Sequence, residues 1–262
     1  MGMNDPAFHV REFRPRYYEM DGRGELTPTA LLDCLEETAF SHCEESGWDV
    51  FRLLKNGYAW VLLRGGFRMD RYPRYGETFT METWLSSSRL FYGTREYRIR
   101  GGGGEPLGFA RSLWLFCSLE RKRPVPVFKE ILEAWAPNGM ETGPLSLDEI
   151  RAVPGKPEAI DGPSFEVRRS EIDTNGHVNN VRYLDWTLEA TDPDLRDTRF
   201  LSYIRGQFKR EVTLGCRVRP TFARMDGDGR CGHAVYADGE GETFLAAAAE
   251  SAWTVRPAGE AA

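Results

Sequence analysis

The sequence contains few cysteines and no long apolar run, and these two shortages argue against disulfide-rich, zinc-binding and membrane-spanning proteins. Its 262 residues include five cysteines, an odd number, and no two of them form a Cys-x-x-Cys pair. Neither a disulfide framework nor a zinc knuckle fits that count and spacing. No apolar stretch approaches the roughly 18 residues of a membrane span, and the first ten residues, "MGMNDPAFHV", lack the apolar core of a secretory signal. We therefore expect a cytoplasmic protein without a membrane span, metal or cofactor.

Basic residues are also in deficit. The chain has 34 lysines and arginines against 40 aspartates and glutamates, a formal net charge of -6. The global field of such a chain does not favour nucleic acid, so we expect no nucleic-acid partner. Two local basic clusters stand out, at Arg121-Lys122-Arg123 and at Lys209-Arg210 followed by Arg217 and Arg219. They are solvated surface unless a substrate arrives on an acidic partner.

The chain repeats itself weakly but in order. Residues 19–26, "EMDGRGEL", align with 171–178, "EIDTNGHV", at a shift of 152. Further on, Ala110, Ser112 and Trp114 align with Ala249, Ser251 and Trp253 at a shift of 139. The order and extent of these matches indicate a duplication.

Each copy predicts one long helix followed by antiparallel strands, an α+β class. The first helix runs from Thr27-Pro28 to Gly47 and the second from about Asn179 to Leu188. The predicted strands cover 58–70, 77–88, 94–100 and 108–120 in the first copy and 199–212, 216–225, 233–238 and 244–255 in the second. We predict an N-terminal domain over 1–128, a proline-rich connection over 129–162 and a C-terminal domain over 163–262.

The two copies differ most at the loop that enters the helix. Asn175 aligns with Arg23, His177 with Glu25, and the pair Asn179-Asn180 with Thr27-Pro28. The first copy therefore has ordinary helix-start residues, whereas the second has amides and an imidazole at the same places. This asymmetry predicts that the second copy carries a site.

The residues of the second loop fit acyl chemistry. Unpaired N–H groups at a helix start can hold the carbonyl oxygen of an ester or thioester as it gains charge. Asp173 and His177 are candidate general bases, and Asn175 can orient a water or a carbonyl. The alternative is a plain turn, in which His177 makes only a structural bond. The backbone groups expected to bind the carbonyl oxygen are those of Gly176, Val178, Asn179 and Asn180.

The stretch "EIDTNGHVNNVRYLDWTLEA" resembles the acyl-acyl carrier protein thioesterases, whose motif Asn-x-His-Val-Asn-Asn is unbroken here at 175–180. In the first copy, "WVLLRGGFRMDRYPRYGETFTMETW" is similar to the family's corresponding stretch. The resemblance implies two tandem hotdog domains, each an antiparallel sheet wrapped around its helix. It implies acyl carrier protein as the partner, and we expect no cofactor. The basic clusters favour an acidic protein carrier, so Lys209 and Arg210 are candidate carrier-binding residues.

The resemblance also implies a catalytic set, which is Asp173, Asn175, His177 and Glu211. The family has a cysteine after that glutamate, but this chain has Val212. A cysteine nucleophile at this position is therefore excluded, which leaves attack by water, or transient attack by Asp173. The residues expected to line the acyl pocket in the first copy are Trp60, Val61, Leu62 and Leu63.

Three other functions stay open. Coenzyme A and the carrier share the pantetheine arm, so an acyl-CoA thioesterase of the same fold would present the same loop. A non-catalytic acyl-binding module would lack the polar loop in both copies, and the second copy keeps it. A hotdog dehydratase is disfavoured because "HVNN" is not its helix start. Chain-length preference and the choice between monomer and homodimer are not encoded in these patterns.

Overall fold

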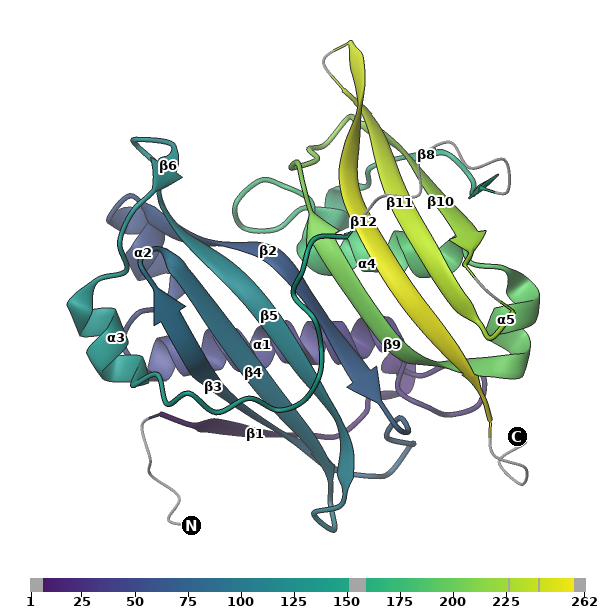
Figure 1. Ribbon diagram of the computed structural model, residues 1–262, viewed down its shortest axis with the longest axis horizontal. Helices are drawn as coiled ribbons and strands as arrows, with labels where there is room; N and C mark the ends of the chain where they lie inside the picture. The colour runs from purple at the N-terminus through teal and green to yellow at the C-terminus, as the bar shows by residue number, and fades with distance from the viewer. Residues whose placement is uncertain (1–6, 151–158, 226, 240, 257–262) are drawn as a thin grey trace. The chain divides into compact units, whose positions relative to one another are not determined.

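The chain forms two compact units, Met1–Leu147 and Asp148–Ala262. The computed structural model describes residues 7–150, 159–225, 227–239 and 241–256. Each unit is a sheet of antiparallel strands packed against one main helix, which confirms the α+β prediction (Figure 1). None of the helices in the described ranges combines the length and hydrophobicity needed to cross a bilayer.

In the first unit the strand order is β1-β3-β4-β5-β2, and the short β6 pairs with β5. Helix α1 packs against β1 and β3. The strands are β1 (His9–Phe13), β2 (Tyr58–Met69), β3 (Phe79–Arg89), β4 (Tyr92–Gly101), β5 (Pro106–Ser118) and β6 (Arg123–Pro124). The helices are η1 (Tyr17–Glu19), α1 (Pro28–Glu45), α2 (Val50–Lys55) and α3 (Lys129–Trp135).

Helix α1 forms where its end signals predict. The Thr27 hydroxyl accepts a hydrogen bond from the Ala30 N–H at 3.2 Å, and Pro28 occupies the first helical position. Leu31 and Leu35 lie one turn apart on the buried face. After the helix, Gly47 adopts a φ of 73°, a conformation that glycine tolerates best.

In the second unit the strand order is β9-β12-β11-β10, and both β7 and β8 pair with β10. Helix α4 packs against β10, β11 and β12. The strands are β7 (Ile160–Asp161), β8 (Phe165–Glu166), β9 (Arg199–Phe208), β10 (Arg217–Arg224), β11 (Arg230–Gly239) and β12 (Glu242–Val255). The helices are η2 (Arg169–Glu171), α4 (Asn180–Glu189) and α5 (Pro193–Thr198).

The predicted connection, 129–162, is divided between the two units. Residues 129–147 belong to the first unit, where α3 buries Ile131 and Trp135 in the core. The remainder belongs to the second unit, and 151–158 lie outside the described residues.

The strand predicted over 199–212 is four residues too long. Strand β9 ends at Phe208, because the N–H groups of Lys209 and Arg210 both donate to the Ala246 carbonyl, at 2.8 and 3.2 Å. When two consecutive N–H groups share one carbonyl acceptor, the regular pairing of the strand is interrupted, as in a β-bulge. Glu211 therefore lies on a segment outside the sheet.

A hydrogen bond from a tryptophan indole N–H to a buried serine hydroxyl recurs in both copies. In the second unit the Ser251 hydroxyl accepts from the Trp253 indole N–H at 3.0 Å and lies 2.8 Å from His233 Nε2. In the first unit Ser112 accepts from the Trp114 indole N–H at 2.8 Å. His233 is fully buried, and this burial lowers the pKa of its imidazole to about 4.

This buried imidazole predicts acid sensitivity. An unfolded histidine binds a proton below a pH of about 6.5, whereas native His233 stays neutral down to a pH of about 4. Over this window the unfolded state binds more protons, so the free energy of unfolding decreases as pH falls, by at most about 3 kcal/mol. Urea unfolding of His233→Gln should lose this part of the pH dependence. An unchanged slope between pH 7 and 4 would contradict the assignment.

Candidate functional site

The loop 171–180 is organised around Asp173. One carboxylate oxygen of Asp173 accepts from the backbone N–H of Asn175 at 2.8 Å and of His177 at 3.3 Å. The Asp173 N–H donates to the His177 carbonyl at 2.8 Å, and Ile172 pairs with Val178 as an isolated bridge. Gly176 takes a φ of 83° at the tip. Asp173 therefore shapes the turn as well as presenting a carboxylate.

The structure brings His177 and Glu211 together. His177 Nε2 lies 3.4 Å from a Glu211 carboxylate oxygen, and the two side chains are 37% and 63% exposed. The pair is therefore open to solvent and to a substrate. The Asn175 side-chain amide lies 3.4 Å from the Asp173 carboxylate, which also accepts the His177 backbone N–H. Three of the predicted catalytic residues therefore lie on this loop, and the fourth, Glu211, contacts it through His177.

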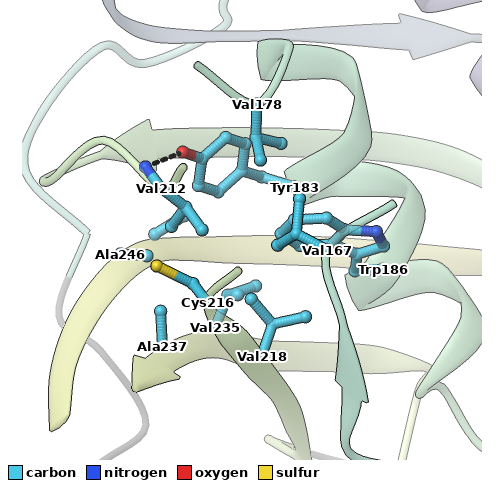
Figure 2. Close-up of a cluster of buried hydrophobic side chains, with 11 residues drawn as sticks. Val167, Val178, Tyr183, Trp186, Val212, Cys216, Val218, Val235, Ala237 and Ala246 are labelled. Atoms are coloured by element: carbon cyan, nitrogen blue, oxygen red, sulfur yellow. Dashed lines mark hydrogen bonds between the residues drawn. The ribbon is translucent and has the colours of Figure 1, made fainter. Parts of the chain in front are cut away.

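Two hydrogen bonds of the Val212 backbone hold the segment that carries Glu211 against the loop and the helix. The Val212 N–H donates to the Tyr183 hydroxyl at 2.9 Å (Figure 2). The Val212 carbonyl accepts from the Val178 N–H at 2.8 Å. Tyr183 is buried on α4, and burial raises the pKa of its phenol above the ordinary range. Glu211 is thus positioned by the residue that follows it.

The side chain at position 212 points into the core. Val212 is fully buried and packs in a cluster with Val218, Val235 and Trp186 (Figure 2). Cys216 belongs to the same buried cluster. Both side chains are buried, and catalysis without a thiol stays a prediction.

The structure corrects the prediction that the backbone N–H groups of this loop bind an acyl oxygen. The N–H groups of Gly176, Val178 and Asn179 already donate, to the carbonyls of Asp173, Val212 and Glu171 at 3.1, 2.8 and 2.9 Å. A closed loop of this kind uses its own donors, so these three N–H groups are not presented to a substrate. Asn180 differs, because it is the first residue of α4 and its N–H has no acceptor within the helix.

The counterpart loop in the first unit has the same frame. An Asp21 carboxylate oxygen accepts from the N–H groups of Arg23 and Glu25 at 2.9 and 3.1 Å, and Gly24 takes a φ of 73°. Where the second unit pairs His177 with Glu211, the first pairs Glu25 with Arg74 at 3.4 Å. The two loops therefore share a backbone frame, while the side chain aligned with His177 is a glutamate that pairs with an arginine.

Sequence reasoning missed two buried side chains that support the loop. Tyr183 is one. The other is Glu171, whose carboxylate accepts from the Trp186 indole N–H at 2.9 Å and from the Arg168 N–H at 2.6 Å. The repeat held the signal for Glu171, because its counterpart Glu19 accepts from the Arg16 N–H at 2.8 Å in the same way.

The predicted pocket residues lie in the first unit, on β2. Trp60 packs against Phe116 and Trp135, with ring centroids 4.9 and 5.8 Å apart. Val61 and Leu62 pair with β5, and the register shifts at Leu63. All four side chains are half-buried, and their role in holding an acyl chain stays a prediction.

Of the predicted carrier-binding residues, Arg210 is already engaged. Its guanidinium lies 2.5 Å from a Glu242 carboxylate oxygen and stacks over the Phe244 ring at 4.0 Å. Lys209 is exposed beside it. Because Arg210 is paired, the Lys209–Arg210 pair carries less free positive charge than the sequence indicated.

Comparison with known proteins agrees with these features. The acyl-ACP thioesterase N-terminal domain model matches residues 6–135, and the C-terminal domain model matches 156–254. A palmitoyl-acyl carrier protein thioesterase of Cuphea hookeriana is 27% identical over 219 residues, 80% of this chain and 53% of the relative. An oleoyl-acyl carrier protein thioesterase of Arabidopsis thaliana is 25% identical over 79% of this chain and 61% of its own. The chain thus spans about half the length of the first of these relatives.

Solved structures share the fold. The 12:0-ACP thioesterase from Umbellularia californica superposes with a TM-score of 0.80 at 21% identity, covering 98% of this chain and 100% of its own. An acyl-ACP thioesterase from Bacteroides thetaiotaomicron gives a TM-score of 0.83 at 21% identity, covering 94% and 98%. These likenesses confirm the predicted hotdog fold. Because both domain models of one family match in order and together cover most of the chain, the protein belongs to the acyl-ACP thioesterase family.

Proposed function

We propose that this chain hydrolyses fatty acyl thioesters of acyl carrier protein to the free fatty acid and the carrier thiol. The observation that carries the proposal is the His177–Glu211 pair, at 3.4 Å. His177 lies on a loop whose counterpart in the first unit has no imidazole. The relatives' names supply the substrate class, since they are called acyl carrier protein thioesterases and hydrolases.

In the proposed mechanism, His177 and Glu211 share the role of general base. A water molecule gives a proton to this pair and attacks the thioester carbonyl carbon. The tetrahedral intermediate then collapses, the carbon–sulfur bond breaks, and the departing pantetheine thiolate takes up the proton. Asn175 and the N–H of Asn180 are the donors left to stabilise the oxyanion.

Attack by water is favoured over attack by Asp173. The Asp173 carboxylate already accepts two backbone N–H groups, at 2.8 and 3.3 Å. Such bonds stabilise a carboxylate and weaken it as a nucleophile, and they tie it to the shape of the turn. We assign Asp173 and Asn175 to orienting the water and the carbonyl group.

A ladder of substrates tests the proposal. The purified chain is incubated with acyl carrier protein and coenzyme A thioesters of 8 to 18 carbons (about the range of common fatty acids), and the release of free thiol is measured. We expect a higher kcat/KM on carrier-bound chains. Faster turnover of the coenzyme A series would identify an acyl-CoA thioesterase instead, and binding without thiol release would identify an acyl-binding module.

The same ladder reports chain length, for which the half-buried β2 residues Trp60, Val61, Leu62 and Leu63 are the proposed lining. Monomer or homodimer, the absence of a nucleic-acid partner and a cytoplasmic location remain predictions. The plant relatives are named as chloroplastic proteins.

A further inference from the structure

One end of the first unit gathers three segments that are distant in sequence. They are α2 with its flanks (49–57), the tip of the β3–β4 hairpin (89–92), and the turn after β5 together with β6 (119–125). We call these three segments the basic end. The Leu119 N–H donates to the Gly57 carbonyl and the Val127 N–H to the Leu90 carbonyl, both at 2.9 Å. Figure 1 shows α2 and β6 at the same end of this unit.

The basic end is strongly positive in an acidic chain. Its three segments contain six basic and two acidic residues, a net charge of +4, whereas the whole chain carries -6. Asp49, one of the two acids, is used to cap α2, accepting from the N–H groups of Phe51 and Arg52 at 2.9 and 3.0 Å. The six basic residues are Arg52, Lys55, Arg89, Arg121, Lys122 and Arg123.

None of these six side chains forms an ion pair with another described residue, and all six are exposed. The Arg52 guanidinium donates to the Gly47 carbonyl at 2.5 Å and lies over the Trp48 ring at 4.4 Å, both of them neutral groups. In the second basic cluster of the sequence, Arg210, Arg217 and Arg219 each pair with a carboxylate. The basic end therefore carries more positive charge without an ion pair than the second cluster does.

Apolar side chains are exposed among these charges. Phe51 is 67% exposed, Leu90 74% and Leu119 43%. Large apolar groups that remain in water beside basic ones are typical of a surface that binds another protein.

We propose that the basic end is the docking surface for the acidic carrier protein, an inference that rests on the proposed function. An acidic partner approaching a chain of net charge -6 is repelled overall, so productive encounter needs a local field of opposite sign. The basic end supplies that field, and its three apolar side chains supply contact area once the carrier has docked. Docking is thereby assigned to Arg121 and its neighbours in place of Lys209 and Arg210.

The test compares two charge reversals of equal size. The variant is Arg121→Glu with Arg123→Glu, which leaves Lys122 intact because its φ is 48°. The matched control is Arg14→Glu with Arg68→Glu, two exposed arginines of the same unit outside the basic end. Three readouts are taken for each protein: kcat/KM on acyl carrier protein thioester, kcat/KM on acyl-pantetheine, and the Kd of the carrier alone.

We expect the basic-end variant to lose about tenfold in kcat/KM and in carrier affinity at low salt, with a weaker dependence on salt. Turnover of acyl-pantetheine should stay within about twofold, because that substrate has no protein to dock. The control should match the wild type on both substrates.

Equal behaviour of the two double variants would overturn the inference. It would also be overturned if the basic-end variant kept carrier affinity and instead lost binding to phosphatidylglycerol vesicles, since the surface would then bind a membrane. A wild type that binds the carrier but releases no thiol would refute the proposed function, while the carrier Kd would still decide the docking surface.

Discussion

We expect the replacement of His177 by alanine to lower kcat on acyl carrier protein thioesters by at least about a hundredfold, the usual size for a lost acid–base group. The imidazole is the group that distinguishes the second loop from the first, and it lies 3.4 Å from the Glu211 carboxylate. The fold should persist, because the loop is held by backbone bonds and by Asp173, none of which needs the imidazole. Thiol release and circular dichroism measure the two effects.

Glu25→Ala is the matched control, since Glu25 is the aligned residue in the first unit. Its partner there is Arg74, at 3.4 Å, and the pair contains no imidazole. Turnover of folded Glu25→Ala should stay within a few-fold of the wild type. Similar losses in both variants would mean that the two positions matter for loop structure only.

Glu211→Gln should also lower kcat by about a hundredfold, because it removes the charge that supports proton transfer through His177 while keeping the side-chain volume. The segment itself should stay in place, held by the Val212 bonds to Tyr183 and Val178. The measurement is kcat from thiol release at saturating acyl carrier protein thioester.

Glu242→Gln provides the comparison for this variant. Glu242 is an exposed carboxylate of the same unit and pairs with Arg210, so its neutralisation also breaks one ion pair. It should leave kcat unchanged. If Glu211→Gln behaved like Glu242→Gln, Glu211 would leave the catalytic set, and Asp173 would become the base to examine.

Much of the fold could be predicted because its signals are local. Thr27 and Pro28 start α1, and alternating side chains mark β3 and β4 within a residue or two of their observed limits. The short α5 was missed although Asp192 caps it, accepting from the Asp194 N–H at 2.9 Å, with Pro193 in the first position. A six-residue helix has too few turns to establish a periodic pattern.

The site was only partly predictable, because its geometry depends on contacts between distant residues. The asymmetry between His177 and Glu25 could be seen in the repeat. The hydrogen bond from the Val178 N–H to the Val212 carbonyl, 34 residues away, could not be predicted. It depends on where the chain leaves β9. Likewise the pairing of Arg210 with Glu242 follows from how the segment after β9 meets β12, which no local pattern encodes.

In the mechanism we propose, His177 and Glu211 of the second unit hydrolyse the thioester without a thiol. The most direct test replaces all five cysteines, Cys34, Cys43, Cys117, Cys216 and Cys231, by alanine and measures kcat on acyl carrier protein thioester, with and without His177→Ala. Three of them are buried, so stability should fall, while the kcat of the folded enzyme should stay within a few-fold of the wild type. Adding His177→Ala should then lower kcat by at least about a hundredfold, as in the wild-type background. A folded cysteine-free enzyme that released no thiol would contradict the account and make a cysteine the nucleophile.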